Sequence, residues 1–220
     1  MMQLAIYGAG RLGKELYDLA YRINAIEHRW QNIFFIDDIR RERHFYFGDV
    51  LRLSEVHSIK DKIEAVVANG TPRNRKKMAE VLRQAGIPLV NLIDPSVIIS
   101  PSALISGGGG TVIRPYSSIS SDAVIGENTL IQPYVHISHD VHVGANTVFS
   151  ANVALGGKLQ IGEECYFGLG AVVREELTIG ARAIIGMGAV VLHDVDCDSI
   201  MVGNPAHVLR KNATGEVFHH

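Results

Sequence analysis

Residues 131–162 read IQPYVHISHDVHVGANTVFSANVALGGKLQIG, and a large aliphatic or aromatic residue occupies every sixth position of this segment. The same count extends in both directions. It covers thirteen consecutive positions without a slip, namely Ile119, Ile125, Ile131, Ile137, Val143, Phe149, Leu155, Ile161, Phe167, Val173, Ile179, Ile185 and Val191. Glycine often follows the large residue, and a smaller or apolar residue stands four positions after it. Such hexads predict a parallel β-helix, in which three hexads close one triangular coil.

Upstream of this segment, Ile93, Ile99 and Ile105 keep the same count, but Ile113 follows only after eight residues. The glycine run 107–110 lies in this gap. We therefore expect a two-residue insertion that bulges from one corner of the coil.

Residues 1–92 have a different texture. Four short apolar runs predict strands at Leu4–Tyr7, Ile33–Ile36, Ala65–Ala68 and Leu89–Leu92. Apolar residues at helical spacing follow the glycine-rich segment 8–13, and Thr71 with Pro72 reads as the start of a second helix that ends before Gly86. Strands that alternate with helices predict a small Rossmann-like parallel sheet. The formal net charge also differs between the two segments: it is +4 for residues 1–92 and −6 for the rest of the chain.

Composition excludes several classes of protein. The chain has 220 residues, of which 47% are hydrophobic and 20% charged, which is a globular balance and excludes wholesale disorder. The net charge of −2 gives no sign of a nucleic-acid partner. No apolar run approaches membrane-spanning length, and the N-terminus lacks the features of a signal peptide. The two cysteines, Cys165 and Cys197, suit a reducing compartment, so we expect a cytoplasmic protein without a membrane partner.

The hexad pattern resembles that of the left-handed β-helix of the hexapeptide acyltransferases over the whole second half of the chain. The predicted fold is therefore an α/β domain over residues 1–92, followed by an all-β left-handed parallel β-helix over residues 93–220 with a C-terminal cap. Such prisms usually form homotrimers, because one flat face of each subunit packs around a threefold axis. Hexapeptide repeats also occur in trimeric carbonic anhydrases and in structural subunits, so a metal-dependent hydratase and a non-catalytic nucleotide-sugar-binding scaffold are alternatives.

The eighteen-residue repeat of the coils indicates a candidate catalytic base. Residues eighteen positions apart stack on neighbouring coils about 4.8 Å apart, which places His139 one layer from Gly157. His139 is not at an inward position of its hexad, so its side chain is expected to point outward. An outward histidine beside a backbone N–H is what acyl transfer requires, because the histidine removes a proton from the acceptor and the N–H stabilises the oxyanion.

The segments Ser138–Gly144 and Ala154–Gly157 resemble the active-site region of bacterial sugar acetyltransferases. This family includes sialic acid O-acetyltransferases and the N-acetyltransferases of nucleotide-linked amino sugars such as bacillosamine and perosamine. In it, the histidine is the base and the acid that follows increases its basicity, roles that would fall on His139 and Asp140. The alternative for Asp140 is an ion-pair row with Lys158. The three histidines His136, His139 and His142 do not share one hexad position, so they should not converge within one subunit, and we expect no metal site.

The resemblance also implies where acetyl-CoA lies. In the family it is a co-substrate that runs along the seam between two prisms toward the C-terminal coils, and no cofactor is tightly bound. The matching positions are Val148, Gly157, Leu169 and Met187. After the last coil, residues 202–206 resemble the short Gly-x-Pro-Ala tail motif of these enzymes.

The segment 8–13 reads Gly-Ala-Gly-Arg-Leu-Gly after a predicted strand, and with Asp37 it satisfies a dinucleotide-binding fingerprint. However, about 92 residues are short for a dinucleotide domain, and no dehydrogenase domain follows. In the sugar acetyltransferases the same loop, an Asp-Asp pair and a Gly-x-x-x-x-Arg segment bind the sugar or nucleotide sugar. The corresponding positions are Gly8, Gly10, Arg11, Leu12, Asp37, Asp38 and Arg75.

Members that act on UDP-linked amino sugars often have Gly-His inside this loop, where this chain has Arg11 and Leu12. Arginine holds a carboxylate or phosphate through two parallel hydrogen bonds, which leaves a carboxylated sugar such as sialic acid open. The alternative is that Arg11 is a solvated residue at a helix start. Together the features predict an acetyl-CoA-dependent acetyltransferase that modifies an amino or hydroxyl group of a sugar for surface glycan biosynthesis.

Overall fold

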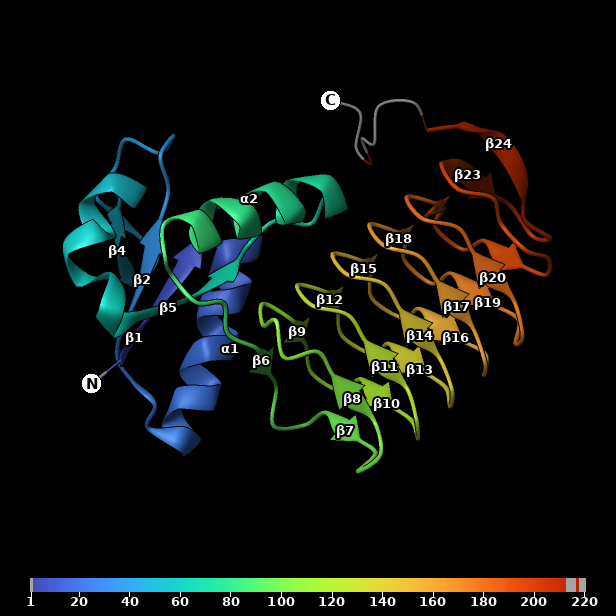
Figure 1. The fold of residues 1–220 in the computed structure, drawn as a ribbon, viewed down its shortest axis with the longest axis horizontal. Helices are drawn as coiled ribbons and strands as arrows, with labels where there is room; N and C mark the ends of the chain where they lie inside the picture. Colours follow the sequence, from blue (N-terminus) through green and yellow to red (C-terminus); the bar gives the residue numbers. More distant parts are fainter. Residues whose placement is uncertain (1, 213–216, 218–220) are drawn as a thin grey trace.

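The computed structural model describes residues 2–212 and 217, and it combines a small α/β sheet with a long triangular prism (Figure 1). The last part of the predicted second domain, residues 213–216 and 218–220, lies outside the described residues. The N-terminal elements are β1 (Met2–Tyr7), α1 (Arg11–Glu27), β2 (Trp30–Ile36), β3 (His44–Phe45), β4 (Gly48–Leu51), the 3-10 helix η1 (Leu53–Lys62), β5 (Ile63–Val67) and α2 (Pro72–Gln84).

These strands form one sheet in the order β3-β4-β2-β1-β5, parallel except for the β3–β4 hairpin, which the sequence did not predict. Helix α1 buries Leu16, Leu19 and Ile23. The expected strand at Leu89–Leu92 was wrong, because Leu89 makes only an isolated bridge with Ala65, while Leu92 pairs in the prism.

Strands of the prism form three sheets, parallel except for the antiparallel pairing of β23 with β24, and we call them the first, second and third faces. The first face consists of β7 (Ile98–Ile99), β10 (Ser118–Ile119), β13 (His136–Ile137), β16 (Ala154–Leu155), β19 (Val172–Val173) and β22 (Val190–Val191). The second face consists of β8 (Leu104–Ile105), β11 (Val124–Ile125), β14 (His142–Val143), β17 (Gln160–Ile161) and β20 (Thr178–Ile179). The third face consists of β6 (Leu92–Ile93), β9 (Val112–Ile113), β12 (Leu130–Ile131), β15 (Val148–Phe149), β18 (Tyr166–Phe167), β21 (Ile184–Ile185), β23 (Ser199–Val202) and β24 (His207–Lys211).

From β9 to β22, successive strands on a face are eighteen residues apart, as in the pairing of Ser118 with His136. The first pairing on each face spans two residues more, as from Ile98 to Ser118, because the glycine insertion lies between them. We call the turns from the third to the first face the first corner, those from the first to the second face the second corner, and those from the second to the third face the third corner. The fold is thus the predicted left-handed parallel β-helix that follows an α/β domain.

The hexad positions fill the interior of the prism. All thirteen predicted aliphatic or aromatic residues are at most 5% exposed, and Phe149 and Phe167 stack with ring centroids 4.7 Å apart. Burial of each such side chain contributes roughly 1.5–3 kcal/mol. Glycine follows several of them because successive coils approach closely, and a Cβ on Gly144 would clash with the backbone nitrogen of Glu163.

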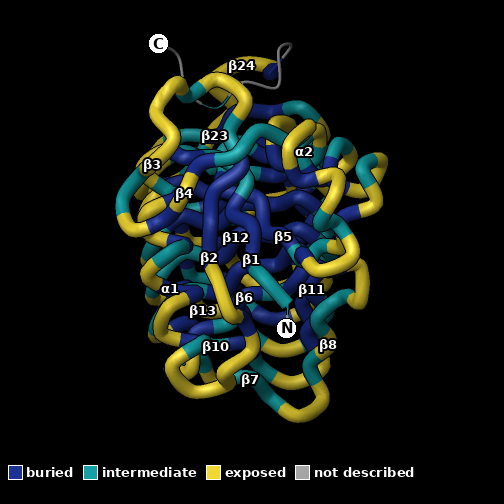
Figure 2. Tube along the Cα trace, turned by 90° about the vertical axis from the view of Figure 1, so that its left-hand side faces the viewer, coloured by how far each residue is buried: buried dark blue, intermediate teal, exposed yellow. Residues whose placement is uncertain are grey.

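The N-terminal sheet and α1 cover part of the third face. Val112, Leu130 and Val148 belong to one buried cluster with residues of β1, β2 and α1. Figure 2 shows this shared core as buried, while the outer turns of the coils are exposed. The glycine insertion turns inward as well, because Gly110 donates to the carbonyl of Val90 at 3.2 Å and Gly109 is buried. The expected outward bulge is therefore limited to Gly107 and Gly108.

Candidate active site

His139 and Asp140 lie in the turn of the second corner between β13 and β14. Nδ1 of His139 is 2.8 Å from Oδ2 of Asp140, and the two side chains are 56% and 49% exposed. Asp140 adopts left-handed backbone with φ of 57°. When Nδ1–H donates to the carboxylate, Nε2 keeps its lone pair and faces solvent as the acceptor.

The imidazole of His139 lies directly against Gly157 on the next coil. A Cβ added to Gly157 would come within 2.7 Å of Cε1 of His139, so only glycine leaves room for the ring there. Within residues 2–212 and 217, the backbone N–H of Gly157 has no hydrogen-bond acceptor. A proton acceptor and a free backbone donor therefore meet at one point of the surface.

The alternative pairing of Asp140 with Lys158 is absent among the described contacts. Nζ of Lys158 instead pairs with Glu176 at 3.1 Å, one coil further on. The carboxylate of Asp140 is consequently committed to His139.

The other two histidines of this coil have separate partners on separate faces. His136 contacts the hydroxyls of Ser118 at 2.8 Å and Ser138 at 3.1 Å on the first face. His142 is 3.2 Å from Nε2 of Gln160 on the second face. Neither ring converges on His139, and within the described residues no group of three or more His, Cys, Asp or Glu is arranged to hold a metal ion.

The chain repeats the His-Asp dipeptide at His193 and Asp194, also on the second corner. There Oδ1 of Asp194 accepts the backbone N–H of Thr178 at 2.8 Å. Since this carboxylate holds the backbone rather than an imidazole, the second dipeptide lacks the arrangement seen at His139.

The structure separates the predicted acetyl-CoA residues within one copy of the chain. Gly157 lies on the second corner, whereas Leu169 and Met187 lie on the first corner and are 51% and 74% exposed. Val148 lies on the third face, 2% exposed in the cluster shared with the N-terminal sheet, and is not brought near the others.

In the N-terminal part, Asp37 closes the glycine-rich loop. Its carboxylate accepts the backbone N–H groups of Ala9 at 2.8 Å and of Ile39 and Arg40 at 2.9 Å. Burial opposes ionisation of Asp37, but these hydrogen bonds outweigh it and lower the pKa below the ordinary value. Asp37 is thus ionised and holds the loop in shape.

A cleft of about 290 Å³ lies beside this loop, and its lining includes Tyr7, Gly8, Asp37, Asp38 and Asn69. Burial, and then the charge of Asp38, raises the pKa of Tyr7, whose hydroxyl is 3.3 Å from Oδ2 of Asp38. This cleft brings together three of the residues predicted to bind the sugar.

Gly10, Arg11 and Leu12 continue from the loop into α1. Gly10 has open space around it, and Arg11 is exposed with no ion pair among the described residues. Leu12 is half-buried and packs against the N-terminal core, and it is not among the residues that line the cleft.

Sequence reasoning missed Arg40. Its Nε donates to the carbonyl of Ala9 at 3.1 Å, and its guanidinium lies 4.1 Å from the ring centre of Phe45. Arg40 lines a second depression of about 470 Å³ on the outer side of the loop. The only signal in the sequence was a cation soon after the Asp-Asp pair.

Arg75, expected to bind the sugar, is instead completely buried between the two parts of the molecule. Its five N–H donors go to the carbonyls of Asn128, Val67, Asn69 and Gly110 and to Oδ1 of Asn128, at 2.9–3.2 Å. Burial lowers the pKa of Arg75 to about 9, so it remains a cation at neutral pH. With no donor left and 0% exposure, it joins the parts and cannot contact a sugar in this arrangement.

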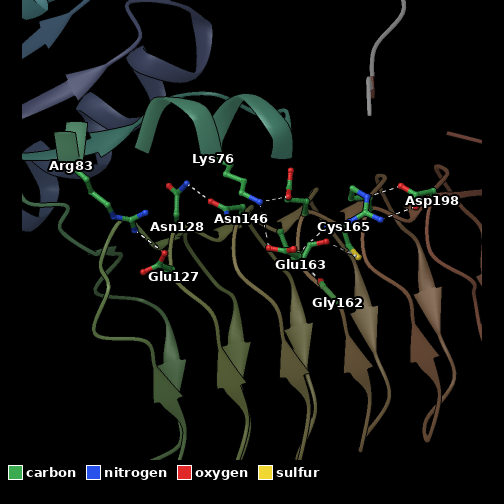
Figure 3. A network of polar contacts seen from close by, with 12 residues as sticks. Lys76, Arg83, Glu127, Asn128, Asn146, Gly162, Glu163, Cys165 and Asp198 are labelled. Atoms are coloured by element: carbon green, nitrogen blue, oxygen red, sulfur yellow. Dashed lines mark hydrogen bonds and ion pairs between the residues drawn. The ribbon is translucent and has the colours of Figure 1, made fainter. Parts of the chain in front are cut away.

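Helix α2 continues this contact along the third corner (Figure 3). Lys76 pairs with Glu164 at 2.7 Å and Glu163 at 3.6 Å, and Arg83 pairs with Glu127 at 2.9 Å. Next to Arg75, Asn128 donates to Asn146 at 2.7 Å. The opposite net charges of the two halves of the sequence therefore meet at this interface.

Two family models match separate parts of the chain. A model described as the PglD N-terminal domain matches residues 3–82, and one described as bacterial transferase hexapeptide (six repeats) matches residues 122–157.

Several solved structures are similar over nearly the whole chain. The acetyltransferase domain of PglB from Neisseria gonorrhoeae FA1090, in complex with acetyl coenzyme A, is 29% identical with a TM-score of 0.87, covering 94% of this chain and 98% of that chain. PerB from Caulobacter crescentus, in complex with CoA and GDP-perosamine, is 26% identical with a TM-score of 0.76, covering 94% and 97%. WeeI from Acinetobacter baumannii AYE is 25% identical with a TM-score of 0.75, covering 95% and 100%. Taken with the two domain matches, these likenesses show that the chain resembles the hexapeptide-repeat bacterial sugar acetyltransferases over nearly its whole length and is an acyltransferase.

Proposed function

We propose that this protein transfers the acetyl group of acetyl-CoA to an amino or hydroxyl group of a sugar for surface glycan biosynthesis. The acceptor class is sialic acid or a nucleotide-linked amino sugar. The observation that carries the proposal is the His139–Asp140 pair, 2.8 Å apart, with its imidazole against Gly157. Acetyl-CoA in the PglB structure and GDP-perosamine in the PerB structure support the two substrate classes.

The mechanism is direct attack within a ternary complex. As the acceptor nitrogen or oxygen attacks the thioester carbon, its proton passes to Nε2 of His139. The carbonyl oxygen becomes an oxyanion and accepts the N–H of Gly157. The C–S bond then breaks, and the CoA sulfur leaves with the proton from His139, so that the acetylated sugar and free CoA are the products.

A covalent acetyl-cysteine has no support at this site. Burial raises the pKa of the Cys165 thiol to about 12, and Cys197 lies on the third corner. The hydroxyl of Ser138 contacts His136 rather than His139. The acceptor itself is therefore the nucleophile, and binding both substrates together supplies much of the rate.

We assign acceptor binding to residues 1–92 and the acetyl donor to residues 93–220. The cleft beside Asp37 and Asp38 lies in the first part, and the His139–Asp140 pair lies in the second. No helix within the described residues has the length and apolarity to cross a membrane. Both cysteines are free, which suits the reducing cytoplasm.

We also propose a homotrimer around an axis parallel to the prism. The N-terminal part covers the third face, and His142, Gln160 and Thr178 give the second face a polar surface. Beside the polar Ser118 and His136, the first face presents the small or apolar residues Ala154, Val172 and Val190 outward. With the first face on the axis, the first corner of each copy meets the second corner of its neighbour, which unites Leu169 and Met187 with Gly157 at one seam.

Light scattering is expected to give a mass of about three times 24.0 kDa at micromolar concentration. A stable monomer under these conditions would contradict the shared seam.

A thiol-release assay tests the activity. Acetyl-CoA is supplied with GDP-perosamine, a UDP-linked amino sugar or free sialic acid. We expect CoA release that depends on one of these acceptors, with the acetylated sugar detected by mass spectrometry. Release that no acceptor stimulates, together with calorimetric binding of a nucleotide sugar, would favour the non-catalytic scaffold instead.

Asp140→Asn is expected to lower kcat by about tenfold, less than the loss of the histidine itself, because the amide keeps the size of the side chain but removes the charge that holds the imidazole. The kcat of the purified variant is compared with that of Lys158→Gln, which breaks only the pair with Glu176 on the same corner. If Asp140→Asn keeps normal kcat, the carboxylate has no role in catalysis.

Arg11→Ala is expected to raise the acceptor KM by about tenfold and to leave the KM for acetyl-CoA nearly unchanged. Arg11 is an exposed cation without an ion pair among the described residues, at the start of α1, where backbone N–H groups already favour an anion. Arg11→Lys restores only part of the affinity, since lysine supplies the charge without the planar fork. An unchanged acceptor KM would show that Arg11 is a solvated residue.

A further inference from the structure

Two tyrosines form an exposed aromatic surface on the first corner. Tyr116 and Tyr134 lie one coil apart, and their rings stack with centroids 5.2 Å apart and an interplanar angle of 20°. The two residues are 60% and 58% exposed. Neither hydroxyl has a hydrogen-bond partner among the described residues, so the pair belongs neither to the core nor to the contact with the N-terminal part.

Both tyrosines occupy positions at which the backbone is left-handed, with φ of 62° for Tyr116 and 61° for Tyr134. Bulky side chains are disfavoured there, and the equivalent residues of the next two coils are Asn152 and Gly170. The turn itself therefore does not require an aromatic residue.

The level of the pair along the prism relates it to the base. Tyr134 and His139 belong to the same coil and lie in the turns before and after β13, five residues apart in the sequence. Rotation around an axis parallel to the prism leaves the height of every residue unchanged. In the proposed trimer, Tyr134 of one copy therefore stands level with His139 of its neighbour, across the seam.

The side chains on the first corner differ between the earlier and the later coils. The aromatic pair lies at and below the level of His139, whereas Leu169 and Met187 lie on later coils. If acetyl-CoA occupies the seam along the later coils, the side of His139 that stays open for the acceptor is the side of the earlier coils, where the tyrosines lie. The C–H face of a pyranose ring is apolar and suits an exposed aromatic ring.

We propose that Tyr116 and Tyr134 of one copy form a platform on which the sugar ring of the acceptor stacks at His139 of the neighbouring copy. The proposal rests on the proposed function and names a specificity-determining surface for it. The platform aligns the acceptor's amino or hydroxyl group with Nε2 of His139 and accommodates a ring whether or not a nucleotide is attached.

The first test separates stacking from hydrogen bonding. Tyr134→Leu is expected to raise the acceptor KM about tenfold, and the double variant Tyr116→Leu with Tyr134→Leu more than that, while the KM for acetyl-CoA stays within about twofold. Tyr134→Phe keeps the ring and is expected to stay near the wild-type KM. Tyr21→Leu serves as the control, because Tyr21 is a similarly exposed tyrosine on α1.

The second test asks which copy supplies the platform. His139→Ala protein and the double tyrosine variant are co-expressed and purified as mixed trimers. One of the three seams in each mixed trimer has both an intact His139 and an intact platform. With the parental homotrimers included, this is about a quarter of all seams for random assembly. At acceptor concentrations below the wild-type KM, the mixture is expected to exceed the summed activity of its parents several-fold.

The outcomes separate the two hypotheses. A wild-type protein that turns over no acceptor of the panel contradicts the proposed function itself. If the wild type is active, an unchanged acceptor KM in the double variant overturns the platform. Loss of the trimer in light scattering of both Tyr134→Leu and Tyr134→Phe also overturns it, because the pair is then an assembly contact. Absence of complementation overturns the assignment to the neighbouring copy.

Discussion

His139→Ala lowers the kcat of acetyl transfer by about 100-fold or more, the usual scale for the loss of a general base. The variant keeps its fold, because the side chain is 56% exposed and contributes nothing to the core. The measurement is CoA release at saturating acetyl-CoA and acceptor, with circular dichroism and light scattering to confirm the fold and the trimer.

The chain provides a matched control in His193→Ala. His193 precedes an aspartate on the same corner, but Asp194 is bonded to the backbone of Thr178, so kcat is expected to change by no more than about twofold. Near-normal kcat in His139→Ala would place the base elsewhere, with His142 as the next residue to replace.

Arg75→Met lowers the free energy of unfolding by about 3–5 kcal/mol. The substitution keeps most of the side-chain volume but leaves the buried carbonyls of Val67, Asn69, Gly110 and Asn128 without their shared donor. Urea unfolding followed by circular dichroism measures the loss. Arg75→Lys recovers only part of it, since three donors replace five.

Lys77→Met is the control for this change, because Lys77 is exposed on the same helix, and its effect is expected to stay within about 0.5 kcal/mol. An Arg75→Met protein that unfolds within about 1 kcal/mol of the wild type would show that water or backbone movement satisfies the four carbonyls.

The β-helix could be predicted because its signal is local. The inward residue can be recognised within each hexad, and thirteen hexads place it at the same phase, so no knowledge of distant contacts is needed. The contact of His139 with Gly157 could be predicted for the same reason, since a glycine one coil away follows from counting. The pairing of Asp140 with His139 was implied only by the resemblance, because counting left Lys158 as an equally near partner.

The misplaced residues depend on how the two parts dock. Arg75 stands in a pattern typical of sugar binding, and nothing in the sequence indicates that the glycine insertion and Asn128 cover it. Val148 holds an outward hexad position that would be exposed on an isolated prism, yet the N-terminal core buries it. Likewise, His139 and His193 share a dipeptide, and only the hydrogen bonds of the two aspartates distinguish them.

Because every coil has the same height, the number of coils between two residues fixes their separation along the prism axis. Adding or removing one coil moves everything beyond it by a single strand spacing of about 4.8 Å. The N-terminal part is fastened at Asn128 and again at Glu164, and His139 lies between these two points. The number of coils between Asn128 and Glu164 is therefore fixed by these two contacts with α2. An inserted coil would break one of the two contacts. A coil added after Glu164 would instead leave both contacts, and the position of the base relative to the N-terminal cleft, unchanged.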